Sequence, residues 1–145
     1  MLKVFFYISL LIAFANCSYA HPHVFVDAEV ELVFENDKII KVRQLWKFDE
    51  FFSSNIIDDF DADKDGKFNQ DEIIQVRNNA FENLKNYNFF NNIFYGDKKI
   101  DKIEYVSFEA KIDNKQVVYD FTIKLEEPIN PTKELTSIGL YDPEF

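Results

Sequence analysis

The chain has 145 residues, which is enough for one domain with a hydrophobic core and too few for two ordinary domains. Apolar residues make up 47% of the sequence, a share that excludes an intrinsically disordered chain. The formal net charge is −10 at pH 7 and the basic residues are not clustered, so we expect no nucleic-acid partner and favour a cation binder.

The beginning of the chain has the layout of a secretory signal peptide. Lys3 supplies a positive start, residues 4–15 form an apolar run, and Ser18 and Ala20 are small residues of the kind that signal peptidase recognises. The run is shorter than the ~20 apolar residues that span a bilayer. We therefore expect residues 1–20 to be removed after Ala20, and the mature chain not to insert into a membrane.

Cys17 is the only cysteine, and it bears on two alternatives. Lipid attachment at Cys17 is disfavoured because Asn16 precedes it, where such signals require a small residue. Cleavage after Ala20 would remove the thiol, and with it disulfides, thiolate catalysis and cysteine-based zinc sites. Since His21 and His23 are the only histidines, the usual nucleophile–base arrangements also lack their residues, so we expect no enzyme.

Two strands are predicted at the start of the mature chain. Residues 23–35 alternate between apolar and mostly acidic side chains, the pattern of a half-buried strand with a solvated acidic face. Asn36 and Asp37 predict a turn, and residues 39–48 a second strand.

The apolar spacing then changes to that of two helices. Phe52, Ile56 and Phe60 recur every four residues, and Asp49 precedes them as a candidate N-cap. After residues 61–72, a second helical stripe is predicted from Ile73, Val76, Ala80, Leu84 and Tyr87.

The remainder of the chain is strand-like. Strands are predicted over residues 89–95, 103–112, 117–125 and 135–141, with turns at 96–97 and 113–114, and with Pro128 and Pro131 interrupting the sequence before the last strand. The expected fold class is α+β. In a single domain of residues 21–145, antiparallel β-strands would carry an inserted EF-hand helix–loop–helix at about residues 49–87.

Residues 61–72, which we call the acidic loop, match the calcium loop of an EF-hand position by position. Gly66 would allow the sharp turn, and the apolar Phe68 would anchor the loop to the core. The predicted calcium ligands are the carboxylates of Asp61, Asp63 and Asp65, the backbone carbonyl of Lys67, Asn69 through a water, and both carboxylate oxygens of Glu72.

The alternative is an acidic surface loop without a metal, but acidic residues and glycine at so many fixed positions favour calcium. Asn69 is also a candidate N-cap for the helix in which Glu72 lies. No second loop of this kind is present in the sequence, so we expect a structural site of weak affinity rather than a switch.

The two histidines suggest a second, different metal site. Cleavage after Ala20 would make His21 the N-terminus, where its α-amine and ring nitrogen could join His23 in binding nickel, copper, cobalt or zinc. Pro22 has no N–H, which excludes the site that uses the amide nitrogen of the second residue. Equally, the two histidines could simply lead into the first strand, and both alternatives stay open.

Four segments together resemble the family known as domain of unknown function 1007. They are residues 21–27 (HPHVFVD), residues 46–50 (WKFDE), the acidic loop after Phe60, and residues 141–143 (YDP). The family is described as exported, as the periplasmic component of an uncharacterised ABC-type transport system. The resemblance implies a periplasmic location and an association with nickel, cobalt or zinc transport, with a membrane metal transporter as partner. Because family members usually continue past the last motif, we expect a shortened member or the product of a broken gene.

Two functions remain in view from the sequence. The first is an exported calcium-binding protein that serves as a periplasmic accessory component of transition-metal transport. The alternative is a purely structural, calcium-stabilised interaction module without a transition-metal role.

Overall fold

The structure is a computed structural model, and it describes residues 24–142. The elements in chain order are β1 (Val26–Glu35), β2 (Lys38–Phe48), α2 (Glu50–Phe60), α3 (Gln70–Asn79), the 3₁₀ helix η1 (Phe81–Phe90), β3 (Asn91–Tyr95), β4 (Lys98–Ile100), β5 (Ile103–Asp113), β6 (Gln116–Ile129) and β7 (Thr136–Leu140). The mixture of helices with antiparallel strands confirms the expected α+β class.

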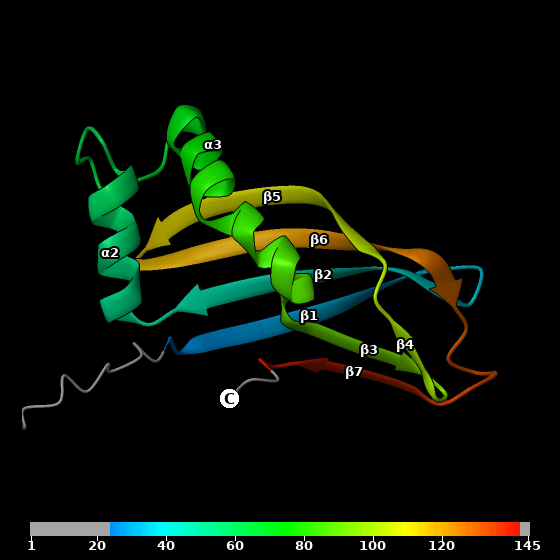
Figure 1. The fold of residues 1–145 in the computed structure, drawn as a ribbon. Coiled ribbons are helices and arrows are strands. Elements are labelled where there is room, and N and C mark those ends of the chain that lie inside the picture. Colours follow the sequence, from blue (N-terminus) through cyan, green and yellow to red (C-terminus); the bar gives the residue numbers. More distant parts are fainter. Residues whose placement is uncertain (1–23, 143–145) are drawn as a thin grey trace, which may run out of the picture.

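Two antiparallel sheets form the framework. The larger has the strand order β1-β2-β6-β5, and the smaller has the order β4-β3-β7. In Figure 1, α2 stands at the end of the larger sheet where β2 finishes, and α3 continues into η1 across the sheet. The core cluster takes side chains from α2, α3, η1, β3 and β4, so all of these elements cover the same face of the larger sheet.

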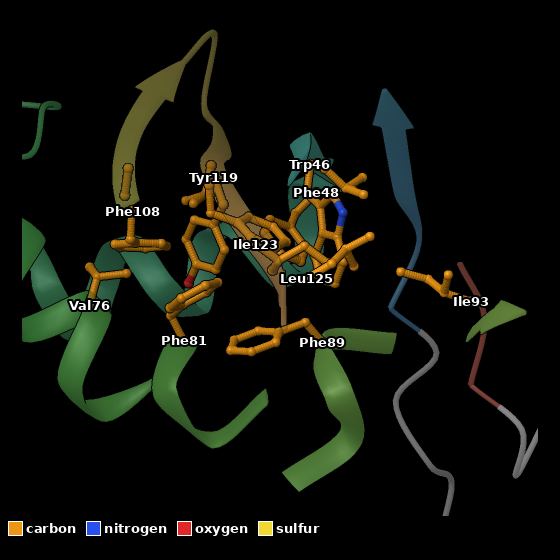
Figure 2. Packing of buried hydrophobic residues seen from close by; sticks show 14 of the residues in the cluster. Trp46, Phe48, Val76, Phe81, Phe89, Ile93, Phe108, Tyr119, Ile123 and Leu125 are labelled. Atoms are coloured by element: carbon orange, nitrogen blue, oxygen red, sulfur yellow. The ribbon is translucent and has the colours of Figure 1, made fainter. Parts of the chain in front are cut away.

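The core is built around β6 and is rich in aromatic side chains (Figure 2). The predicted alternation of β6 is confirmed, because Val117, Tyr119, Phe121, Ile123 and Leu125 are all at most 2% exposed. Phe81, which the sequence did not single out, is fully buried against them. Its ring stacks on Phe108 with centroids 4.2 Å apart and lies 5.0 Å from Phe121.

The expected half-burial of the first strand is wrong. The apolar residues of β1 do share one face, since Val26, Ala28 and Leu32 lie opposite the buried Phe48, Trp46 and Val42 of β2. Nothing in residues 24–142 covers that face, however, and all of β1 except Val33 is exposed. α2 packs on β6, α3 packs on β5, and Phe90 of η1 stacks on Trp46 of β2, whereas the side chains of β1 other than Val33 stay exposed.

The second predicted helix is shorter than expected. α3 ends at Asn79, and the chain continues as η1 with left-handed φ angles at Asn88 (53°) and Phe89 (49°). Asparagine side chains compete with helical hydrogen bonding here, as Asn79 Nδ2 donates to the carbonyl of Gln75 at 2.9 Å. Phe89 is buried beside Phe121 of β6, whereas Tyr87, expected on the apolar stripe, is 56% exposed.

Two details of the strands also differ from the prediction. β6 continues through Pro128 to Ile129, because a register shift in β2 between Ile39 and Lys41 interrupts the ladder there and no N–H is needed. The short strand β4 was not predicted at all. The final predicted strand is confirmed as β7.

Candidate metal centre

The acidic loop connects α2 to α3, and both helix starts are capped as the sequence predicts. The side chain of Asp49 accepts a hydrogen bond from the N–H of Phe52 at the start of α2. At the start of α3, Asn69 and Glu72 form a reciprocal capping box. These caps fix the two ends between which the loop turns.

Three carboxylates converge inside the loop. One oxygen each from Asp61, Asp63 and Asp65 lies within 4.8 Å of the others. Calcium–oxygen distances of 2.3–2.6 Å place ligands on opposite sides of one ion about 5 Å apart. The three oxygens therefore have a spacing that one calcium ion can bridge, and Asp61 is only 5% exposed while its two partners are open to solvent.

Backbone N–H groups hold these carboxylates in place. Asp65 N–H donates to Asp61 Oδ1 (3.2 Å) and to Asp63 Oδ1 (3.1 Å). Gly66 N–H donates to Asp61 Oδ2 (3.0 Å), and Lys67 N–H to Asp65 Oδ1 (2.8 Å). The loop is thus curled around its own acidic side chains.

Gly66 has the conformation that the sequence predicts. Its φ of +80° lies in the region that disfavours side chains with a Cβ, and a Cβ placed there would meet no atom within 4 Å. The requirement for glycine therefore comes from the backbone turn and not from crowding.

Glu72 closes the loop by joining its two ends. Oε1 accepts from the N–H of Ala62 at 2.8 Å, Oε2 accepts from the N–H of Asn69 at 2.9 Å, and the residue is only 6% exposed. Its carboxylate is not one of the three that converge. Each oxygen retains a lone pair, since an ionised carboxylate has about four acceptor sites.

Asn69, which was predicted to bind calcium through a water, has other contacts in this structure. Asn69 Oδ1 accepts from the N–H groups of Asp71 (3.0 Å) and Glu72 (3.1 Å), so its carbonyl oxygen serves as a helix cap. Phe68 packs against the core cluster, which confirms its expected anchoring role.

None of the loop carboxylates of Asp61, Asp63, Asp65 and Glu72 forms an ion pair with a residue of the described chain, 24–142. Carboxylates that converge without a basic partner repel one another, and a hard cation would relieve that repulsion. The donor set, which is all oxygen, matches calcium better than a transition metal.

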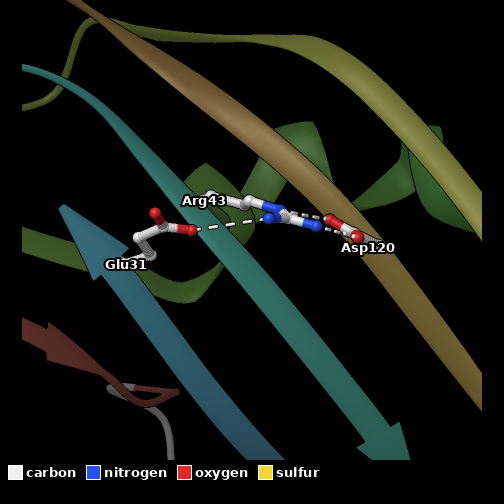
Figure 3. Close-up of polar contacts among 3 residues, drawn as sticks. All are labelled: Glu31, Arg43 and Asp120. Carbon is white, nitrogen blue, oxygen red and sulfur yellow. Dashed lines mark hydrogen bonds and ion pairs between the residues drawn. The ribbon is translucent and has the colours of Figure 1, made fainter. Parts of the chain in front are cut away.

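On the outer face of the larger sheet, by contrast, carboxylates are paired with a basic side chain (Figure 3). Arg43 on β2 donates from Nε and Nη2 to the two carboxylate oxygens of Asp120 on β6, at 3.0 and 2.6 Å. Its Nη1 lies 3.5 Å from Glu31 on β1. The Arg43 guanidinium lowers the pKa of Asp120 from its ordinary value, chiefly through these hydrogen bonds.

The predicted site at His21 and His23 lies outside the described residues, and so does the predicted signal peptide. Asp27, on the strand that follows His23, lies on β1 opposite Lys47. In residues 24–142, no helix has the length and apolar character needed to cross a bilayer.

A cavity of about 610 Å³ was missed by the sequence analysis. It is mainly apolar and lies beside the first half of β1, bounded by Val26, Ala28, Trp46, Leu84 and Tyr119 among others. No motif marks these residues. The only sequence feature that pointed to the cavity is the long alternating segment of residues 23–35. Its apolar face needs a covering helix or strand, and the sequence does not show which one.

Comparison with known proteins places this α+β domain in a family. A family model described as "Protein of unknown function (DUF1007)" matches residues 6–145, so the chain belongs to this family. No solved structure matches the chain.

Two relatives were found, and the description of neither one names an activity. An "Uncharacterized protein" of Haemophilus influenzae is 25% identical over 130 residues, covering 87% of this chain and 60% of the relative. An "Uncharacterized 15.5 kDa protein in trpE 3'region" of Spirochaeta aurantia is 29% identical over 87 residues, covering 60% of this chain and 61% of the relative. The chain thus spans about 60% of the length of these relatives.

Proposed function

We propose that this chain binds one calcium ion in the acidic loop, which acts as a single EF-hand, and that the ion stabilises the domain. The observation that carries the proposal is the convergence of the Asp61, Asp63 and Asp65 carboxylates within 4.8 Å, without a basic partner in the described residues. Calcium prefers such oxygen ligands, and the spacing of the three residues is that of EF-hand positions 1, 3 and 5.

The other ligands in the proposal are the Lys67 carbonyl, Asn69 through a water, and Glu72. Glu72 already contacts both ends of the loop through the N–H groups of Ala62 and Asn69. Its two carboxylate oxygens keep lone pairs that the ion could use. Calcium would then connect α2 to α3 directly, which explains how it adds stability.

We expect a dissociation constant on the order of 0.1–1 mM, the range of extracellular calcium modules. At ~1 mM calcium, the tighter limit would raise the free energy of unfolding by about 1.4 kcal/mol by mass action. Such a site is a structural support in a calcium-rich compartment rather than a cytoplasmic signal detector.

Thermal unfolding with and without calcium tests this proposal. The wild-type melting temperature should rise with calcium and respond far less to magnesium, which demands a smaller, octahedral site. Glu72→Gln should lose most of the rise. Asp71→Asn is the matched control, because it makes the same change of charge in the same loop at a residue without a ligand role, and it should keep the rise. If calcium does not raise the melting temperature of the wild type, the assignment of the calcium site is wrong.

Export to the periplasm and an accessory role in nickel, cobalt or zinc transport are a further part of the proposal. They rest on the signal-peptide pattern, on His21 and His23, and on what the family resemblance implies. Every donor in the described loop is an oxygen, so the loop itself supports only the calcium part of the proposal. The narrower alternative is a calcium-stabilised interaction module without a transition-metal role.

The histidine site has its own test. Protein that begins at His21 should bind nickel, copper or zinc in a calorimetric titration, and protein with one extra N-terminal glycine should bind much more weakly. The extra residue keeps both imidazoles but moves the terminal amine away from His21. Equal binding by both proteins, or binding by neither, would leave the calcium module as the whole function.

A further inference from the structure

The outer edge of β1 is open. The larger sheet ends at β1, and no strand of residues 24–142 pairs with its outer side. β1 is ten residues long, so a full row of backbone N–H and C=O groups faces outward. Natural proteins usually cover or shorten such an edge.

The core-side face of β1 is also uncovered. Val26, Val30, Leu32 and Phe34 are 36%, 44%, 37% and 53% exposed, although the residues beside them on β2 are buried. This row continues the hydrophobic core outward by one strand, so one further strand beside β1 would extend the same apolar surface.

The apolar cavity lies at the start of this row. The small side chain of Ala28 leaves room above Trp46, and Tyr119 forms part of the wall. The Tyr119 hydroxyl is buried and has no hydrogen-bond partner within residues 24–142. A large apolar side chain from an added strand would fill this space.

The opposite face of β1 is acidic. Asp27, Glu29 and Glu31 point to the outer side of the sheet, and only Glu31 forms an ion pair with a described residue, Arg43. A second copy of this chain paired antiparallel through β1 would bring these like charges opposite one another, which destabilises a ladder. The charge pattern therefore disfavours self-pairing and favours a basic partner.

We propose that the outer edge of β1 accepts an extended segment of another protein in which apolar and basic residues alternate. Its apolar side chains would cover Val26, Val30, Leu32 and Phe34, with a large one in the cavity beside Ala28. Its basic side chains would face Asp27 and Glu29. Backbone hydrogen bonds supply affinity in this mode of recognition, and the alternating side chains supply specificity. The inference does not depend on calcium binding.

A labelled ten-residue peptide is the probe. Lysine alternates with valine, and one central valine is replaced by phenylalanine. One control peptide has the same residues in a non-alternating order, and a second has glutamate in place of lysine. The protein is expressed from the whole 145-residue sequence and purified. Fluorescence anisotropy then measures peptide binding. The alternating lysine peptide should bind at least about tenfold more tightly than either control, and added salt should weaken it.

Charge reversal gives the decisive comparison. Glu29→Lys should weaken the lysine peptide about tenfold and improve binding of the glutamate peptide. Glu109→Lys is the matched control, since Glu109 is an exposed residue on the opposite edge strand, β5, and it should change neither affinity. Both substitutions are at exposed positions and should leave the fold intact.

Three results would overturn the proposal: equal binding of the alternating and non-alternating peptides, no effect of Glu29→Lys, or a concentration-dependent dimer that excludes the peptide. The last result would assign the β1 edge to a second copy of the chain.

Discussion

Two acidic regions of this molecule use their carboxylates in opposite ways. On the outer face of the larger sheet, Arg43 lies between Asp120 and Glu31, so negative charge is balanced across three strands (Figure 3). In the acidic loop, three carboxylates converge on one another and are held only by backbone N–H groups. Composition alone cannot distinguish the two regions. Their partners can, and the region whose carboxylates form no ion pair within residues 24–142 is the one suited to a metal ion.

The largest expected effect comes from Asp61→Ala in the loop. The substitution removes one proposed ligand, and it also leaves the N–H of Gly66 without its acceptor in a partly buried position. We expect the free energy of unfolding to fall by about 1–3 kcal/mol without calcium and the response to calcium to disappear. Chemical denaturation in chelator and in calcium measures both. An unchanged calcium response would show that the ion binds elsewhere.

A smaller effect with a change of sign is expected for Asp63→Asn. Asp63 is exposed, and its neighbours' negative charges lie within 4.8 Å. Removing its charge should raise the free energy of unfolding in chelator by up to about 1 kcal/mol at low salt, and should reduce the stabilisation that calcium provides. Chemical denaturation of wild type and Asp63→Asn, in chelator and in calcium, measures both changes in the free energy of unfolding. A loss of stability in chelator would mean that the hydrogen bond from the Asp65 N–H to the Asp63 carboxylate outweighs the repulsion.

Arg43→Gln tests the other acidic region, on the outer face of the larger sheet. It removes the hydrogen bonds to Asp120 and the contact with Glu31, both near the surface, so the loss of stability should be smaller than for Asp61→Ala. Calcium affinity should stay the same, because the ion pairs lie on the face of the sheet away from the loop. A changed calcium affinity would contradict the independence of the two regions.

The smallest effect concerns pH. Arg43 lowers the pKa of Asp120 in the folded protein, so the pair contributes stability above the ordinary aspartate pKa of about 3.9. That contribution is lost as the pH falls through the lower folded value. The difference in unfolding free energy between wild type and Arg43→Gln should therefore be constant at neutral pH and shrink below about pH 4. A difference that persists at strongly acidic pH would mean that the pair does not act through charge.

The sequence predicted the local features of the site correctly. The caps at Asp49 and Asn69, the positive φ of Gly66 and the anchoring of Phe68 follow from interactions between residues close in the chain. Calcium binding by this loop remains a prediction.

The features that the sequence could not supply depend on distant parts of the chain. Alternation correctly put the apolar residues of β1 on one face, but their burial depends on whether another element reaches that face. The end of α3 was misplaced for a similar reason. The buried positions of Phe81 and Phe89 arise from contacts with β5 and β6, and these outweigh the helical spacing that pointed to Tyr87.

The most direct test of the central claim is a calcium titration followed by two-dimensional NMR of backbone amides. The N–H groups of Asp65, Gly66 and Lys67 donate to the converging carboxylates, so their resonances report on the loop itself. We predict that these three resonances shift and saturate together below ~10 mM calcium, while those of Glu31, Arg43 and Asp120 stay in place. If the loop resonances do not move, or if the shifts appear on the outer face of the sheet instead, the account of the two acidic regions is wrong.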